Sequence, residues 1–227
     1  MFSFLKRLWP FKKKGFSDEQ YEKHYELKKK GIERILGPMY ELVGHSLIPF
    51  QMGGAVDMYY FTSCMPGTVF ATMELIEPDG SSPKPNYNGA YELITCTKLT
   101  MPPPEPHEVR SKRIKEGQLS DFEKIECRMS GIMTGIGNYS FDAVIKAGET
   151  AEVPWGDDEE YCLVFDEFDT KGIPFEIEGK KHSLLLCIEI FRSEMEYAME
   201  FGSKLLLAKL KDSGYYPYSD LDRRPVV

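Results

Sequence analysis

The sequence predicts an α+β domain, with a mixed, mainly antiparallel central sheet flanked by an N-terminal and a C-terminal helix. Helical patterns near both ends of the chain, with strand-like segments between them, support this fold class. The composition agrees, because 42% of the 227 residues are hydrophobic and 28% are charged, as in ordinary globular proteins. We find no linker pattern, so we predict an arm of residues 1–16 followed by a single domain of residues 17–227.

The first helix is predicted for residues 18–36. Ser17 and Gln20 have the spacing of a capping box, in which each side chain accepts a hydrogen bond from the other residue's backbone N–H. Apolar residues then recur at helical spacing. Gly37 and Pro38 end the pattern, because glycine adopts the left-handed cap conformation and proline cannot continue a helix.

The middle of the chain contains segments that favour strands, because they are rich in β-branched, aromatic and other apolar residues. These segments are residues 56–61, 68–76, 90–97, 160–165, 172–179 and 182–190. The alternation in residues 90–97 predicts one face in contact with water. Residues 182–190 are almost continuously apolar, which predicts a central strand buried on both faces.

The stretch from residue 100 to residue 137 has weaker signals. Residues 100–106 contain four prolines and predict a stiff, polyproline-like connector. Residues 107–130 are charged and partly helical, and we interpret their basic residues as a solvated face because acids are interspersed. The Gly-rich segment 131–137 matches neither the dinucleotide-binding nor the P-loop pattern, so we assign it no phosphate-binding role.

A second capping-box pattern, Ser193 to Glu196, predicts the start of a C-terminal helix that ends near Gly214. Gly202 lies in the middle of that helix, where glycine costs about 1 kcal/mol relative to alanine. We therefore expect Gly202 to allow close packing of the helix on the sheet. Four charged residues near the end of the chain are expected to form a salt-bridge group that fastens the tail to the core: Asp220, Asp222, Arg223 and Arg224.

The charge balance predicts an acidic protein. Asp and Glu number 36 and Lys and Arg 28, which gives a formal net charge of −8. Nucleic acid is not an expected partner, because phosphate backbones attract basic surfaces. An acidic surface suits a basic protein partner, or it serves only solubility.

The cysteines and histidines predict a reducing, cytoplasmic location without a metal or cofactor. The five cysteines are odd in number, none forms a C-x-x-C pair, and we see no cleavable signal peptide. They are Cys64, Cys96, Cys127, Cys162 and Cys187. The four histidines are too scattered to supply the close ligand pairs of a zinc site.

Residues 1–14 are aromatic and basic. One interpretation is weak peripheral membrane contact, with the aromatic side chains on anionic lipid. The other is a short arm that packs Phe2, Leu5 and Trp9 on its own domain. Pro10 interrupts any helix, and the apolar run is too short for a transmembrane segment.

An acidic run with two aromatic residues is the candidate partner-binding surface. Its residues are Trp155, Asp157, Asp158, Glu159, Glu160, Tyr161, Asp166, Glu167 and Asp169. The carboxylates would bind Lys or Arg on a partner, and Trp155 and Tyr161 would supply apolar anchors. The alternative is a solvated turn. The ordered ligand pattern of a calcium loop is absent from the run.

Several stretches, in this order, resemble the suppressor-of-fused-like family. They are residues 44–46 (Gly-His-Ser), 56–61, 89–94, 147–150, 190–206 and 220–226. The last two are the most specific, because a strand leads to a helix that contains a glycine and a Leu pair, followed by a terminal Asp-x-x-Arg. The resemblance covers roughly residues 40–227, and it suggests a bacterial single-domain member.

The resemblance implies a non-enzymatic protein-binding domain. Bacterial relatives of this size are often taken as cytoplasmic immunity proteins, which neutralise a cognate toxin by occlusion. An acidic surface would suit a basic nuclease toxin. Two alternatives stay open. One is an enzyme whose site the sequence does not reveal, since neither G-x-S-x-G nor H-E-x-x-H occurs. The other is a membrane-peripheral adaptor that uses the N-terminal arm.

Overall fold

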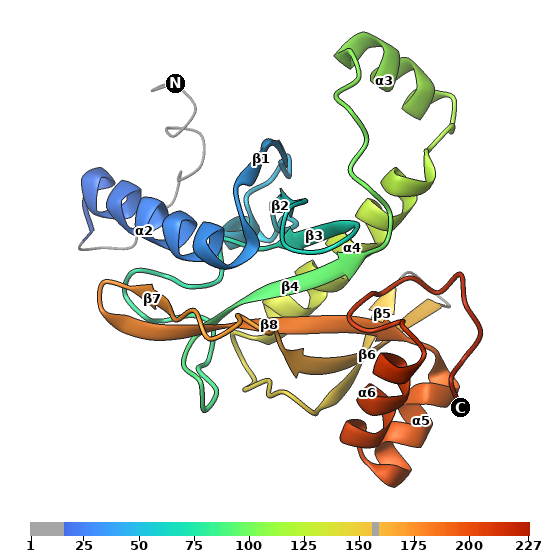
Figure 1. Ribbon diagram of the computed structural model, residues 1–227. Helices are drawn as coiled ribbons and strands as arrows, with labels where there is room; N and C mark the ends of the chain where they lie inside the picture. Colours follow the sequence, from blue (N-terminus) through green and yellow to red (C-terminus); the bar gives the residue numbers. More distant parts are fainter. Residues whose placement is uncertain (1–15, 156–158) are drawn as a thin grey trace.

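A single twisted sheet with helices on both faces makes up the fold (Figure 1). The computed structural model describes residues 16–155 and 159–227, and for His107, Trp155 and Glu159 it describes the backbone alone. The helices are α2 (Asp18–Leu36), α3 (His107–Lys115), α4 (Asp121–Tyr139), α5 (Arg192–Phe201) and α6 (Ser203–Asp212), with a 3-10 turn, η1, at Phe50–Met52. The strands are β1 (Met39–Gly44), β2 (Met58–Phe61), β3 (Thr68–Ala71), β4 (Tyr91–Thr97), β5 (Thr150–Trp155), β6 (Glu159–Glu167), β7 (Phe175–Ile177) and β8 (Lys180–Ile190).

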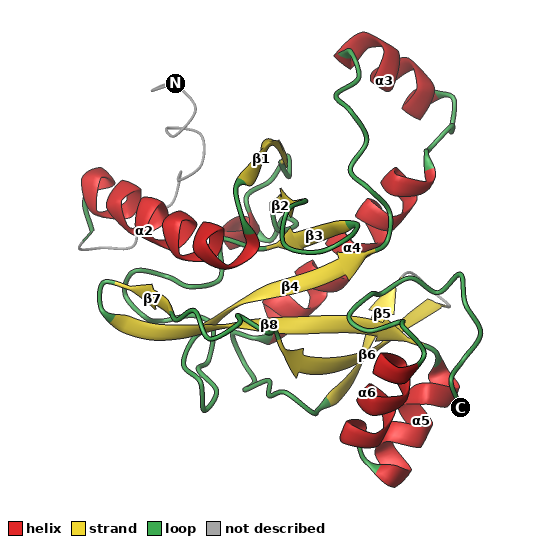
Figure 2. Cartoon of the chain, in the orientation of Figure 1, coloured by secondary structure: helices red, strands yellow, loops and turns green. Residues whose placement is uncertain are grey.

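The sheet is mixed and mainly antiparallel, which confirms the predicted fold class. Its order is β1-β2-β3-β4-β8-β6-β5, with β7 paired to one end of β8. The central pair, β4 and β8, is parallel, and the other pairings are antiparallel. Strands β1 and β5 therefore form the two edges (Figure 2).

Two apolar layers cover the two faces of the sheet. On one face, α2, α5 and α6 pack side chains such as Ile32, Leu206 and Leu210 against the strands. On the other face, α4 packs Met129 and Met133 against them. Full burial of each such side chain contributes about 1.5–3 kcal/mol, so the packing of the two layers, rather than helix propensity, holds the helices in place.

Strand β8 is central and buried from Leu184 to Ile190, as predicted. The expected wet face of β4 is wrong, because all seven of its residues are buried. Glu92 points inward, where its carboxylate meets the Lys28 ammonium of α2 at 2.8 Å. An acid at an alternating position of a strand can therefore mark a buried ion pair instead of a solvated face.

Helix α2 has the predicted bounds and the predicted capping box. Helix α4, in contrast, extends beyond the predicted helical region and includes the whole Gly-rich segment 131–137. Its glycines reduce helix propensity, but they let the helix approach its neighbours closely. A Cβ atom on Gly135 would lie 2.6 Å from the Val153 side chain, and one on Gly137 would lie 3.0 Å from Phe50.

The predicted C-terminal helix is divided into α5 and α6 at Gly202, which has a φ of +96°. The expected close packing at Gly202 is wrong, since a Cβ atom there would have no neighbour within 4 Å. The residue is glycine because other side chains rarely adopt this backbone conformation. Helix α5 also begins one residue before Ser193, with Phe191 as its N-cap.

The tail is fastened to the core as expected, but through different partners. The Arg223 guanidinium donates to the Glu194 carboxylate at 2.6 and 2.8 Å, and both side chains are buried. Asp220 accepts hydrogen bonds from the Thr97 hydroxyl at 2.5 Å and from the Lys98 backbone at 2.8 Å. The side chains of Asp222 and Arg224 are exposed. The four charges thus do not form one cluster.

Candidate functional site

Helix α3 stands away from the sheet, at the end of a long excursion between β4 and α4 (Figures 1 and 2). Every α3 side chain that the structure describes is exposed or only partly buried, and Val109 and Ile114 are both exposed. A nine-residue helix without an apolar contact face is marginal in water. Other interactions must therefore hold α3 where it lies.

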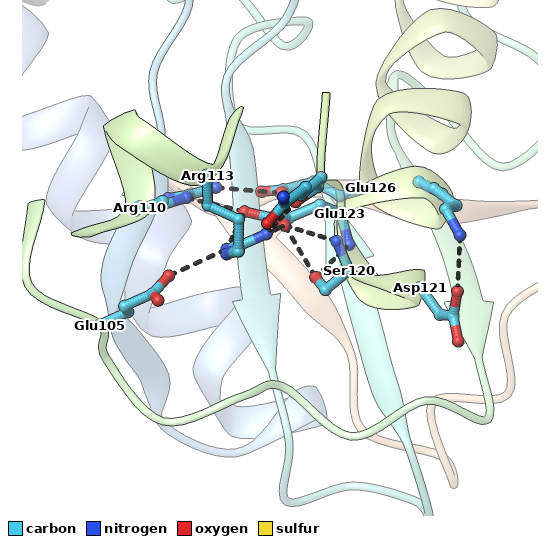
Figure 3. Close-up of polar contacts among 9 residues, drawn as sticks. Glu105, Arg110, Arg113, Ser120, Asp121, Glu123 and Glu126 are labelled. Carbon is cyan, nitrogen blue, oxygen red and sulfur yellow. Dashed lines mark hydrogen bonds and ion pairs between the residues drawn. The ribbon is translucent and has the colours of Figure 1, made fainter. Parts of the chain in front are cut away.

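Two arginines of α3 connect it to the first turns of α4 (Figure 3). Arg113 donates to both carboxylate oxygens of Glu123, at 2.5 and 3.0 Å, and to Glu105 at 2.9 Å. Arg110 donates to Glu123 at 3.1 Å and reaches Glu126 at 3.5 Å. The Arg113 guanidinium holds the pKa of Glu123 well below its usual range, although desolvation opposes it. We call these five residues the arm network.

The arm network forms one wall of an open groove of about 1390 Å³. The proline-rich connector, residues 101–106, and residues 42–46, in β1 and just after it, also line the groove. Met58, Tyr60 and Phe122 also line the groove. Its surface therefore combines apolar side chains with the charged arm network.

The Tyr60 hydroxyl donates a hydrogen bond to the carboxylate of Glu126 inside the groove. Burial, reinforced by the charge of Glu126, raises the pKa of Tyr60 far above its usual value. Tyr60 therefore stays a neutral donor at any physiological pH, and it orients Glu126 from β2 while Arg110 approaches the same carboxylate from α3.

Exposed apolar side chains lie beside the groove. Leu42 of β1 lines it and is exposed. The loop between Ser46 and Ala55, both lining residues, adds three exposed apolar side chains: Leu47, Ile48 and Met52. Contiguous exposed apolar surface on a soluble protein commonly marks an interaction site. The groove therefore has the composition of a protein-binding surface, with apolar borders and a few fixed charges.

A group of titratable residues lies at the β1 end of the groove. The His45 Nδ1 atom lies 2.6 Å from the Asp57 carboxylate, which also accepts a hydrogen bond from the Ser46 backbone. The Asp57 backbone donates to Glu74 at 2.7 Å. Desolvation, reinforced by the Asp57 charge, raises the pKa of Glu74 to about 8. Glu74 is thus mostly protonated at neutral pH. In the part of the chain that the structure describes, no group of three metal-ligating side chains converges.

The predicted acidic surface is divided between the two ends of β6. Asp166 lies six positions after Glu160 along the strand, which corresponds to about 20 Å. Glu160 forms an ion pair with Arg192 at 2.5 Å, and Asp166 accepts a hydrogen bond from Tyr216 at 3.1 Å. The Glu167 carboxylate meets Asn88, and Asp169 accepts from the backbone of its own turn. These acids therefore do not converge on one surface.

Tyr161 is buried, with 3% of its surface exposed, and it stacks on the Arg128 guanidinium at 4.6 Å. It cannot serve as the exposed apolar anchor that the sequence analysis assigned to it. Asp157 and Asp158 lie outside the described residues, as do the side chains of Trp155 and Glu159 and the whole of residues 1–14. The described residues of the predicted surface therefore do not lie together on one face.

The arm network was not predicted, because the basic residues between 107 and 130 were interpreted as a solvated face. A signal was present. Arg110 and Arg113 are three residues apart on one helix, and so are Glu123 and Glu126 on the next, so each pair projects from one helix face. Two such matching pairs on consecutive helices predict a bridge between the helices.

No protein-family model and no curated protein matches the sequence. Among solved structures, the chain is similar to one in the crystal structure of the Sufu-Fu complex. The TM-score is 0.55 and the identity 13%, and the match covers 89% of this chain and 92% of that one. The fold is therefore of the suppressor-of-fused type, and at this identity the likeness concerns the fold alone. None of the described helices is long and apolar enough to span a bilayer.

Proposed function

We propose that this protein is a non-enzymatic protein-binding domain whose partner binds in the groove between α3, α4 and β1. One observation carries the proposal. Ion pairs join α3 to α4, and an open groove lined by the two arginines of α3 and by residues 42–46 lies next to the loop that exposes the apolar side chain of Leu47. A partner segment seated there would bury this apolar side chain and would give α3 the contact face that it lacks.

The structural comparison supports binding as the kind of activity. The matched structure is described as a complex of Sufu with Fu, so a chain of this fold occurs together with a protein partner. The match spans almost the whole of both chains, which means that the similarity is not confined to a shared substructure. We extend only the general activity, protein binding, from that structure to this chain.

The finer proposal is that the partner is a toxin domain, and that this chain is a cytoplasmic immunity protein that neutralises it by occlusion. The net charge of −8 supports a basic partner, because complementary charge speeds association and disfavours wrong partners. An inhibitor of this kind needs a rigid surface and no chemistry. The two packed layers beneath the groove supply that rigidity.

The two alternatives make different use of the chain. An enzyme would have to employ His45 and Asp57, whose contact has the geometry of an oriented acid–base pair, at the end of the groove. A membrane-peripheral adaptor would have to employ residues 1–14. We favour binding over both because the groove borders exposed apolar side chains and the exposed helix α3, which a bound partner would cover.

The test is to identify a partner and to reconstitute the complex from purified components. We expect a tagged copy to retain one protein through purification from its native cells. The isolated pair should then bind with 1:1 stoichiometry in calorimetry and suppress any toxicity of the partner. Leu47→Ser should weaken this binding, whereas Met199→Ser, which alters an exposed apolar residue on α5, should not. Equal binding by both variants would place the interface elsewhere.

A further inference from the structure

We propose that the partner segment in the groove contains a basic side chain flanked by apolar residues, and that this basic group takes the place of Arg110 at the Glu126 carboxylate. The inference rests on the proposed function, because it specifies what the groove binds. It follows from a difference between the two glutamates of α4 that the arm network contains.

Glu123 is fully engaged. It accepts two hydrogen bonds from Arg113, one from Arg110, and two more from the backbone and hydroxyl of Ser120, all at 2.5–3.1 Å. Its side chain is only 7% exposed. An incoming cation would find no oxygen there that is not already satisfied. Glu123 is therefore the fixed part of the network.

Glu126 is held more loosely by its cation. Its contact with Arg110 is 3.5 Å long, the upper limit for a hydrogen bond, and the Arg110 side chain is 47% exposed. Its firm contact is the neutral hydroxyl of Tyr60. Tyr60 orients the carboxylate in the groove without neutralising its charge, so a closer cation would gain a charge-assisted hydrogen bond.

Arg110 can leave Glu126 without losing its other charge partner. Its Nε atom donates to Glu123 at 3.1 Å, a contact separate from the one that its NH2 group makes with Glu126. An ion pair this long, whose cation is half exposed to water although the Glu126 side chain is only 16% exposed, contributes little to stability. Replacing the long contact by a shorter one from a partner therefore costs little.

The surroundings specify the flanks of the basic residue. Leu42, Met58 and Phe122 line the same groove as Glu126, and the exposed side chains of Leu47 and Ile48 lie beside it. A segment with apolar residues on both sides of one Lys or Arg would match this arrangement. The net charge of −8 would attract such a segment before contact.

A displayed library of random short peptides, selected on the full chain, tests the inference without knowledge of the natural partner. We expect enriched peptides with a Lys or Arg between apolar residues. For a synthetic copy of the leading peptide, Glu126→Gln should weaken binding about tenfold or more, while Gln still accepts the Tyr60 hydrogen bond. Arg110→Gln should strengthen binding about two- to fivefold, because it removes the competing cation.

Glu200→Gln, which removes an exposed carboxylate from α5, is the matched control and should leave binding unchanged. Replacing the peptide's Arg by citrulline tests the same contact on the unaltered protein, should Glu126→Gln fold poorly. The inference is overturned if no peptides are enriched, if they lack a basic residue, if Glu126→Gln binds as tightly as the wild type, or if Arg110→Gln weakens binding.

The peptide selection and the partner reconstitution test different claims, so a negative result in one can be distinguished from a negative result in the other. A natural partner that binds the wild type and Glu126→Gln equally contradicts the exchange at Glu126 but leaves the protein-binding function intact. Peptides that bind as expected, in a protein that retains no natural partner, contradict the immunity role and leave the groove chemistry intact.

Discussion

Ion pairs hold both the body of this protein and its arm together, but the two regions use them in opposite ways. In the body, a buried acid meets one base from a distant element, as in Lys28–Glu92 and Arg223–Glu194. In the arm, two partly exposed arginines share three glutamates. Buried pairs fix one geometry, because breaking them exposes an unpaired charge to the core. Exposed, shared pairs can be exchanged at little cost.

The Lys28–Glu92 pair shows how completely the body satisfies its charges. The Lys28 ammonium uses its three donors on Glu92, on Met73 O at 2.8 Å and on Ile76 O at 2.7 Å. Glu92 also accepts hydrogen bonds from the Thr72 hydroxyl and from two backbone N–H groups of the segment after β3. The pair therefore connects α2, β4 and that segment.

The largest effect should come from breaking this pair. Glu92→Ala leaves the Lys28 ammonium without a counter-charge in the core, and we expect it to lower the free energy of unfolding by about 3–5 kcal/mol. Urea unfolding followed by circular dichroism measures the loss. The double variant Lys28→Met/Glu92→Leu should recover only part of it, because it removes the unpaired charge but leaves the other partners of Glu92 without hydrogen bonds. A loss below about 1 kcal/mol in Glu92→Ala would show that the body's pairs behave like those of the arm.

Glu74 offers a third case beside the buried and the partly exposed ion pairs. It is a largely desolvated acid that has no basic partner among the described residues and stays neutral by keeping its proton. Its pKa is raised to about 8, so the folded state retains a proton that the unfolded state loses near pH 4.3. The contribution of Glu74 to the free energy of unfolding is therefore fully present below about pH 4, and it is lost as the pH rises through about 8.

We therefore expect Glu74→Gln to flatten the fall in melting temperature between pH 5 and pH 9, since Gln reproduces the neutral side chain. Thermal unfolding across that range measures the difference between variant and wild type. Glu200→Gln controls for the loss of a surface carboxylate. Parallel pH profiles for Glu74→Gln and the wild type would mean that Glu74 is ionised in the folded protein.

The smallest effect on global stability should come from the arm. Arg113→Ala removes the bridge from α3 to Glu123 and Glu105, and we expect only a small loss of unfolding free energy, because none of the α3 side chains that the structure describes is buried in the core. The amides of α3 should nevertheless exchange with solvent much faster, because few other contacts hold the helix. A large loss of global stability would show that the arm is part of the core.

The elements that the sequence predicted correctly are those whose signals are local. Helix α2 and strand β8 were predicted because their signals are local: a capping box in one case and a continuous apolar run in the other. The second half of α4 was missed because its glycines lower the local helix propensity. Glycine is needed at positions such as Gly135 for close contact with residues distant in the sequence, such as Val153. Edge strands β1 and β5 were missed because their patterns are short and mixed in polarity.

The groove was beyond prediction from local patterns, because it is assembled from β1, β2, the proline connector and α4, which lie far apart in the sequence. In the acidic run, the expected exposure of Tyr161 was wrong. In β6, Tyr161, Leu163 and Phe165 alternate on the face that packs against α4, so the strand's own period placed Tyr161 inside. The interpretation relied on the number of acids in the run, whereas the alternation of apolar residues along β6 indicates which side chains are buried.

Hydrogen exchange of the complex with its reconstituted partner tests the central claim most directly. We predict that the amides of α3 exchange rapidly in the free protein and become strongly protected on binding, together with the loop around Leu47, while those of α5 and α6 do not change. Protection that spares α3 and the Leu47 loop and appears instead on α5, α6 or the ends of β6 would contradict the assignment of the groove as the binding site.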